Sequence, residues 1–198
     1  MRESGLPGAG AVPSGTHILH YYNHGRQLIE VQAEFCRAGL IGGEYCLWIT
    51  TPPYTEAIAR HELARNLPNV ADYLEQGQLQ FVPYSSWYFD NGHFDSEMTV
   101  QRSGRKLAEA KARGFRGARI CGALSWLTTP EQWSRFLAFE QAIHQAVTGS
   151  DIIGLCSYPI RPDRRPDHDD RGRVLLAAHH AVLRPAAQQW SYVSPIAT

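Results

Sequence analysis

The feature that most constrains this chain is the regular alternation of short apolar runs with longer amphipathic segments. Runs rich in β-branched and aromatic residues predict strands at residues 17–22, 45–50, 79–82, 118–121 and 151–157, with a further strand at 190–193. Apolar residues at helical spacing predict helices at residues 26–38, 55–65, 70–75, 96–113, 130–146 and 173–183. Parallel strands need helix-length crossovers, so this order predicts a three-layer α/β fold: a mostly parallel sheet with helices on both faces.

The length of 198 residues suits one domain better than two. Residues 1–15 are rich in Gly, Pro, Ala and Ser without a periodic apolar pattern, so we expect a flexible N-terminal segment there. Residues 16–198 are expected to form a single domain. Within it, residues 161–173 hold five arginines and four aspartates, which predicts a mobile, solvated loop.

Charge and cysteine content exclude several classes of protein. Nineteen Lys and Arg balance nineteen Asp and Glu, so no uniform field attracts nucleic acid or an anionic membrane, and we expect binding to neither. No apolar stretch approaches the roughly 18 residues that span a bilayer. The widely spaced cysteines form no Cys-x-x-Cys pair, which predicts buried free thiols in a reducing cytoplasm: Cys36, Cys46, Cys121 and Cys156.

Motifs for phosphate binding and nucleophilic catalysis are missing. The loop after the first expected strand, Asn23-His24-Gly25-Arg26, has one glycine and no P-loop pattern, and no Gly-x-Gly-x-x-Gly follows any strand. We therefore expect no nucleotide cofactor. Ser125 lacks the Gly-x-Ser-x-Gly elbow, and Cys121 and Cys156 end expected strands without a base placed beside them.

Three histidines near the start of the chain are candidates for a metal site. Side chains alternate along a strand, so His17 and His20 are expected on opposite faces. His20 and His24 converge if the chain turns after Tyr22, which makes these two the candidate ligands of copper or zinc. The alternative is that His20 is a buried, hydrogen-bonded histidine.

Aromatic residues gather at or just beyond the expected carboxyl ends of the strands. Ligands of open parallel sheets bind outside those ends, so the placement predicts an apolar pocket for a small organic molecule. The alternative is that the rings only fill the core. The residues are Tyr21, Tyr22, Trp48, Tyr54, Tyr84, Trp87, Tyr88, Phe89, Trp126 and Tyr158.

The order and spacing of several segments together resemble those of a known family. The segments are Gly15-Thr16-His17-Ile18-Leu19-His20-Tyr21-Tyr22, residues 39–50, 77–80, 90–95, 119–122 with Trp126, Phe139-Glu140, Leu155-Cys156-Ser157-Tyr158-Pro159, and a late helix with His180. Through them, and over about residues 15 to 193, the chain is similar to the MEDS domain, the methanogen/methylotroph sensory domain found in the dichloromethane dehalogenase repressor.

This resemblance implies a RecA-like core without a P-loop, which senses simple hydrocarbon derivatives in prokaryotic signalling and transcription. Many members carry a Glu where this chain has Ala123, so the polar anchor of the ligand is expected to differ here. The family's sensors are often fused to an output module, and we expect the output partner to be a separate protein or a module outside this chain. An oligomer is compatible with this. The family's characteristic residues correspond to His17, Tyr22, Glu44, Trp126, Tyr158 and His180.

Together these observations predict a non-enzymatic cytoplasmic sensory domain for a small organic ligand, with the segment 84–94 as the element that responds. Three alternatives stay open: a metal or haem sensor built on the histidines, a small-molecule enzyme using His17 or Cys156, and an interaction module with an exposed apolar patch. The expected ligand-binding residues are His17, His20, Tyr22, Trp48, Trp87, Trp126, Tyr158 and His180.

Overall fold

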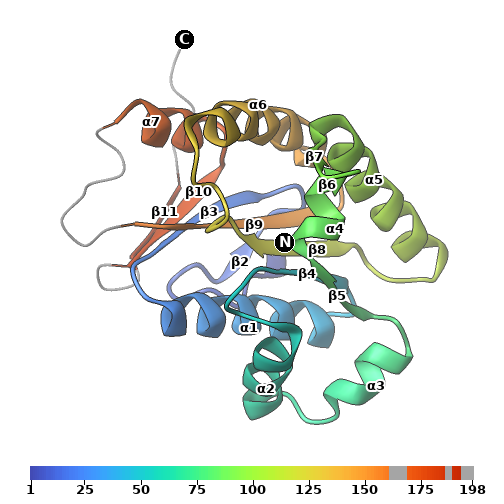
Figure 1. Ribbon diagram of the computed structural model, residues 1–198. Helices are drawn as coiled ribbons and strands as arrows, with labels where there is room; N and C mark the ends of the chain where they lie inside the picture. The colour runs from blue at the N-terminus through green and yellow to red at the C-terminus, as the bar shows by residue number, and fades with distance from the viewer. Residues whose placement is uncertain (161–168, 186–188, 193–198) are drawn as a thin grey trace.

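A seven-stranded sheet forms the centre of the computed structural model, which describes residues 1–160, 169–185 and 189–192. Six strands are parallel, in the order β10-β3-β9-β8-β4-β5, and β11 (Gln189–Tyr192) pairs antiparallel with β10 at one edge. This confirms the expected three-layer α/β fold (Figure 1). The parallel strands are β3 (His17–Tyr22), β4 (Tyr45–Thr50), β5 (Leu79–Pro83), β8 (Ala118–Ala123), β9 (Ile152–Pro159) and β10 (Ala181–Arg184).

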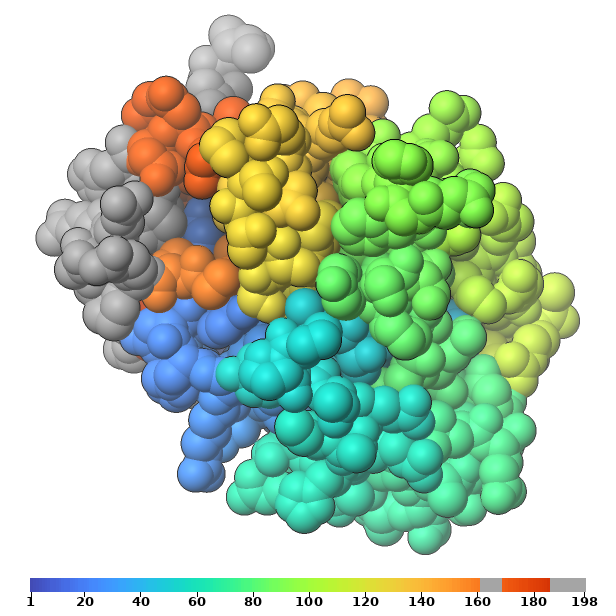
Figure 2. Space-filling view, in the orientation of Figure 1, coloured from blue at the N-terminus to red at the C-terminus, as the bar shows by residue number. Residues whose placement is uncertain are grey.

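Helices cover the sheet on both faces (Figure 1). One face carries α1 (Gly25–Ile41), α2 (Glu56–Asn66) and α3 (Val70–Glu75). The other carries α4 (Tyr84–Tyr88), α5 (Ser96–Ala112), α6 (Pro130–Val147) and α7 (Asp170–Ala177). In the space-filling view the green, yellow and orange helices and loops make up most of the upper half of the surface and hide the strands beneath (Figure 2).

The alternation of side chains divides the interior into two cores. Leu19, Leu47 and Ile152 belong to the core under α4–α7, whereas Ile18, Trp48 and Leu155 belong to the core under α1–α3. All six are at most 3% exposed, which explains why these strands are apolar along their whole length. Residues next to each other in sequence therefore face different sides of the sheet, and this decides which candidate residues meet.

The helix expected at residues 173–183 is wrong in its second half. Helix α7 begins earlier, at Asp170, because the Asp169 carboxylate accepts a hydrogen bond from Gly172 N at 2.7 Å. It ends at Ala177, and Ala181–Arg184 forms β10, whose apolar side chains are buried beside β3. The expected mobile loop at 161–173 therefore overlaps α7, and residues 161–168 lie outside the described part of the chain.

Residues 1–15 are not the flexible segment that their composition predicts. They contain β1 (Arg2–Glu3) and β2 (Ala11–Val12), which pair antiparallel, and Leu6 and Val12 are buried in the core beside α1. Gly5 has a φ of 75° and lies so close to α1 that an added Cβ would be 2.2 Å from Glu34 O. Gly5 therefore permits the close packing of the hairpin on α1.

A buried ion network fastens this N-terminal hairpin to the sheet. Arg119 of β8 is 0% exposed and donates from Nε and Nη2 to the two Glu44 carboxylate oxygens, each at 3.0 Å. Arg119 Nη1 also donates to Ser4 O at 2.8 Å and to Phe35 O at 3.0 Å. Arg2 Nη1 donates to Glu44 Oε2 at 2.8 Å. The hairpin thus supplies acceptors and a second cation around a buried carboxylate.

We expect Glu44→Gln to lower the free energy of unfolding by about 3 kcal/mol, because it leaves the Arg2 and Arg119 guanidinium groups buried without their carboxylate. Glu34→Gln is the matched control, since Glu34 pairs with Arg37 at 2.8 Å where both side chains are 32% exposed. Its expected loss is below about 1 kcal/mol. Urea unfolding measures both values, and equal losses would contradict the role given to Glu44.

Candidate functional site

Four side chains that can bind metal meet between the sheet and the helices α6 and α7. They are His17 at the start of β3, Glu140 of α6, Cys156 of β9 and His179 just after α7, and one ligand atom from each lies within 4.8 Å of all the others. In the β3–β9 register His17 pairs with Gly154, so Cys156 is two residues further along on the same face. We call these four residues the His–Glu–Cys cluster.

The two imidazoles of the cluster turn the same ring nitrogen inward. His17 Nδ1 lies 2.9 Å from Ala178 O, and His179 Nδ1 lies 2.6 Å from Leu175 O. A carbonyl oxygen only accepts, so each Nδ1 carries the proton and each Nε2 is left with a lone pair. Burial holds the pKa of His17 well below its ordinary value and lowers that of His179 to about 3, so both rings are neutral.

Glu140 stands between these two nitrogens. Its Oε2 is 3.5 Å from His17 Nε2 and 3.5 Å from His179 Nε2, while its Oε1 accepts a hydrogen bond from the Tyr158 hydroxyl. Burial raises the pKa of Glu140 to about 7, against the opposing effect of the nearby Tyr158 hydroxyl and Cys156 thiol. By hydrogen-bond geometry neither Glu140 Oε2 nor His179 Nε2 has a partner among the described residues.

Cys156 and His17 form a pair that resembles the nucleophile and base of a thiol enzyme, with Sγ 3.4 Å from Nε2. A thiol nucleophile must ionise readily, which needs a lowered pKa. Here burial raises the pKa of the Cys156 thiol well above its ordinary value, and the neighbouring Glu140 acts in the same direction. The pair therefore lacks the electrostatics of an activated thiolate.

Two further histidines lie outside the cluster, toward solvent. His180 Nδ1 accepts a hydrogen bond from His17 N at 3.0 Å, so His180 orients the start of β3 and its ring does not enter the cluster. The His144 ring is 5.8 Å from His17 and 4.4 Å from His180, measured between ring centroids. Both outer rings are partly exposed.

A small apolar cavity adjoins the cluster. Its volume is about 40 Å³, which corresponds to about three water-sized positions. His17 and Cys156 contribute its polar atoms together with Ser103, and the remaining lining is nearly all apolar: Ile49, Trp87, Tyr88, Ile120, Phe139, Ile143, Val147, Ile152 and Gly154. The cavity lies in the layer between the sheet and the helices α4, α5 and α6, and not in a crevice at the strand ends.

Trp126 is the centre of an aromatic cluster that covers this layer. The aromatic segment that the sequence leaves irregular forms α4 and a short hairpin, β6 (Phe89–Asp90) with β7 (His93–Phe94), and its rings pack on the Trp126 indole. The centroid distance from Trp126 is 5.8 Å to Tyr84, 5.5 Å to Tyr88 and 5.2 Å to Phe89. Trp126 therefore contacts residues that precede and follow the cavity-lining Trp87.

The eight expected binding residues do not line one pocket. His17, Trp87 and Tyr158 meet at the cluster and the cavity, and His180 and Trp126 lie nearby on the same side of the sheet. The other three face α1 or the strand ends beside it, because side chains alternate along β3 and β4: His20, Tyr22 and Trp48.

The structure gives His20 and His24, the ligands expected for a metal site, different surroundings. His20 is 0% exposed, and its Nδ1 lies 3.1 Å from Ser157 Oγ, which also accepts from Gln32 of α1 at 3.2 Å. His24 is exposed and is the N-cap of α1, its Nδ1 accepting from Gln27 N at 3.2 Å. Neither belongs to the group of converging ligand atoms in the described residues.

The remaining residues on the α1 side are structural. Trp48 is 1% exposed and packs on Phe81, with 5.8 Å between ring centroids. Tyr22 packs with Leu28 and Ala123, and burial raises the pKa of its hydroxyl to about 12. The Tyr54 hydroxyl lies where a Cβ on Gly25 would be, at 1.5 Å. A side chain of the protein thus occupies the start of α1, where a P-loop fold places phosphate.

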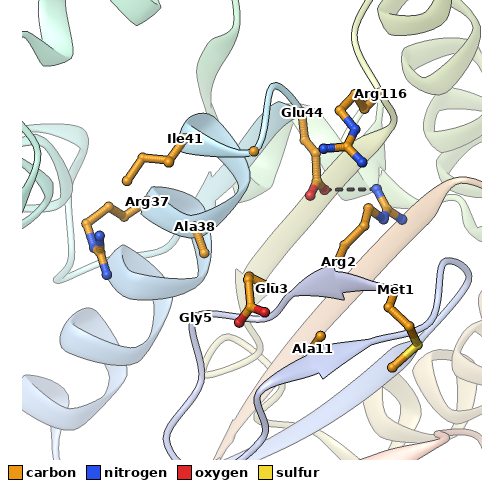
Figure 3. A pocket seen from close by; sticks show the side chains of 11 residues that line it. Met1, Arg2, Glu3, Gly5, Ala11, Arg37, Ala38, Ile41, Glu44 and Arg116 are labelled. Atoms are coloured by element: carbon orange, nitrogen blue, oxygen red, sulfur yellow. Dashed lines mark hydrogen bonds and ion pairs between the residues drawn. The ribbon is translucent and has the colours of Figure 1, made fainter.

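A larger pocket lies at the amino ends of the strands, between the N-terminal hairpin and the end of α1 (Figure 3). Its volume is about 550 Å³, and Arg2, Arg37 and Arg116 are among the residues that line it. Arg2 is paired with Glu44 and Arg37 with Glu34, so two of these three charges are already balanced. The pocket is at the amino ends of the strands, away from the edge where parallel sheets bind ligands.

Sequence reasoning missed Glu140 and His179 as members of the site. Glu140 is 0% exposed on the apolar face of α6, between Phe136 and Ile143 at helical spacing. A carboxylate on such a face is a signal that could have found it, because buried acids need a partner. His179 was placed inside a helix that ends two residues earlier, so its position next to β3 had no sequence signal.

The fold and the buried site define a RecA-like α/β domain with a filled phosphate loop and an interior site beneath its second helix layer. The structure is similar to that of a KaiC-like protein from the hyperthermophilic archaeon Pyrococcus horikoshii OT3, with a TM-score of 0.63 and 16% sequence identity. The match covers 93% of this chain and 80% of that protein and shows the fold alone.

The chain belongs to the MEDS family, described as the methanogen/methylotroph, DcmR sensory domain, whose sequence profile matches residues 16–171. A comparison with curated proteins gives no match. The family assigns the chain a sensory role. In the described residues no helix is long and apolar enough to cross a membrane.

The His20 environment makes a pH-dependent prediction. Burial lowers the pKa of His20 to about 3 from 6.5, so below pH 6.5 the unfolded chain binds a proton that the folded chain does not. Stability from this residue is present above pH 6.5 and is lost as the pH falls. Between pH 7 and pH 5.5 the free energy of unfolding should therefore fall by about 1 kcal/mol less for His20→Asn than for the wild type.

Chemical denaturation at the two pH values measures this difference. The contributions of the other buried histidines cancel, because both proteins contain them. His61→Asn on the exposed surface of α2 is the control and should follow the wild type. If His20→Asn also follows the wild type, then His20 does not stay neutral in the folded protein.

Proposed function

We propose that this chain is a non-catalytic cytoplasmic sensory domain that binds a small, weakly polar organic molecule in the apolar cavity beside His17 and Cys156. The observation that carries the proposal is the cavity itself, about 40 Å³ in volume, with a mostly apolar lining that includes the polar residues His17, Cys156 and Ser103. Such a lining binds an apolar body and orients one polar group. The size favours molecules of one to three carbon atoms.

The chemistry of the neighbouring groups supports sensing over catalysis. An enzyme at this position would need an ionised thiol or a histidine that exchanges protons near neutral pH. Burial moves the pKa of Cys156 upward and that of His17 downward, which keeps both groups neutral. Neutral groups can donate or accept a hydrogen bond to a bound alcohol, thioether or alkyl halide without reacting with it.

Helix α4 is the element through which we expect binding to be transmitted. Trp87 and Tyr88 line the cavity, and Tyr84 of the same helix stacks on Trp126 with 5.8 Å between centroids. A ligand changes a conformational equilibrium only if it contacts the two states differently, and α4 is in contact with the ligand position. The output would be a separate protein or a fused module that contacts the surface of α4 and the β6–β7 hairpin.

A substitution on α6 that fills the cavity tests this proposal. Ile143 lines it and is 8% exposed, so Ile143→Phe should occupy the space and weaken binding at least tenfold. Thermal unfolding in the presence of one- to three-carbon alcohols, thioethers and alkyl halides should show stabilisation of the wild type, of about 2.7 kcal/mol at a hundred times the Kd. The same compounds should stabilise Ile143→Phe much less.

Leu137→Phe is the matched control, because Leu137 is on the same helix, packs in the same core and does not line the cavity. It should bind the stabilising compound as the wild type does. The proposal is wrong if no compound of this size stabilises the wild type, or if Ile143→Phe retains the full effect. Conversion of a bound compound into product would contradict the non-catalytic role.

A further inference from the structure

We infer that the His–Glu–Cys cluster is a binding site for one divalent transition-metal ion, with Zn²⁺ as the best fit. The four ligands are His17 Nε2, His179 Nε2, Cys156 Sγ and Glu140 Oε2, and the Cys156 thiol releases its proton to solvent when the ion binds. This inference does not depend on the organic ligand proposed above, because it stands on the arrangement of the donor atoms alone.

The spacing of the donor atoms matches a tetrahedral site. With Zn–N near 2.0 Å, Zn–O near 2.0 Å and Zn–S near 2.3 Å, tetrahedral ligands lie about 3.3–3.6 Å from one another. Three of the six donor separations fall in this range, at 3.5 Å from Glu140 Oε2 to each Nε2 atom and 3.4 Å from His17 Nε2 to Cys156 Sγ, and all six are at most 4.8 Å. The donors come from β3, α6, β9 and the α7–β10 connection, so the folded core holds them together.

Hydrogen bonds among the four side chains explain this spacing less well than a metal ion does. A proton on Glu140 would have to bridge to His179 Nε2 across 3.5 Å, whereas N–H···O and O–H···N bonds in proteins are about 2.7–3.2 Å long. Glu140 Oε2 and His179 Nε2 are buried and lack a hydrogen-bond partner in the described part of the chain. Buried lone pairs that face one another are costly unless a positive centre lies between them.

The surroundings fix which nitrogen of each imidazole is free, as in metal sites, although the two rings are stacked with 3.9 Å between centroids, so one ring must turn for both nitrogens to face a single ion. Histidine ligands typically donate their second ring N–H to a carbonyl or carboxylate, and here Ala178 O and Leu175 O accept from the two Nδ1 atoms. The Tyr158 hydroxyl donates to the second carboxylate oxygen of Glu140 and fixes its rotation. Each of these partners leaves the inward-facing atom of its ligand available.

The charge of the donor set also fits a dication. One thiolate and one carboxylate balance Zn²⁺, and the two imidazoles are neutral, so the loaded site carries no net charge. Mixed imidazole, thiolate and carboxylate donors at four positions are typical of zinc. Cys156 is the one partly exposed member and also lines the cavity, so a ligand in the cavity would contact the metal site.

The test uses the full chain, purified without a histidine tag, stripped with a chelator and loaded with Zn²⁺ or Co²⁺. We expect one Zn²⁺ per chain after dialysis, and a Co²⁺ spectrum with tetrahedral d–d bands and a thiolate-to-cobalt charge-transfer band. Cys156→Ser should abolish the charge-transfer band. Both Cys156→Ser and Glu140→Gln should weaken Zn²⁺ at least tenfold in competition with a chelating dye.

Cys121→Ser and His20→Asn are the matched controls. Cys121 is a buried thiol on the neighbouring strand whose partner is Cys36 at 3.6 Å, and His20 is on β3 but faces α1. Both variants should bind Zn²⁺ with unchanged stoichiometry and affinity. Circular dichroism checks that each variant folds, and if Cys156→Ser does not, the charge-transfer band of the wild type alone tests ligation by a thiolate.

The metal site is refuted if the wild type retains no Zn²⁺, if its Co²⁺ form has no charge-transfer band, or if Cys156→Ser binds as tightly as the controls. Ile143→Phe separates this result from the organic-ligand proposal, since it should retain Zn²⁺ while losing the small organic compound. Loss of compound binding in all proteins, with Zn²⁺ retained, would contradict only the organic ligand.

Discussion

The parallel pairing of β3 with β9 decides which residues of this protein meet. Successive side chains on both strands face opposite sides of the sheet, so His17 lies beside Cys156 under α6 while His20 lies beside Ser157 under α1. A shift of one residue in this register would exchange the two groups. The buried site therefore depends on the same hydrogen-bonded ladder that forms the centre of the sheet.

Much of the fold could be predicted from the sequence. Strands buried on both faces are apolar throughout, whereas in helices the apolar residues recur at helical spacing. The expected bounds of β3 and β4 agree with the structure. The N-terminal hairpin could not be predicted, since its order depends on contacts with Arg119, more than a hundred residues away in sequence. His17 and Tyr158 of the candidate site were found, whereas Glu140 and His179 join it only through tertiary packing.

The start of the first helix, where P-loop folds place phosphate, is filled from within this protein. Tyr54 occupies the space at Gly25, and His24 caps the first helix with its own ring. The positive end of α1 is satisfied by the protein itself. On the opposite face from α1, in the layer between the sheet and α6, Glu140 Oε2 and His179 Nε2 are buried without a hydrogen-bond partner among the described residues.

The burial of the cavity has a consequence for timing. Trp87, Phe139 and Val147 are each at most 4% exposed and the cavity holds only about 40 Å³, so a larger molecule fits there only when the helix layer moves. Exchange is then governed by motions of helices, which are far slower than diffusion to an open cleft. Under the proposed function, the occupancy of this site follows the average concentration of its ligand over the opening time and ignores brief pulses.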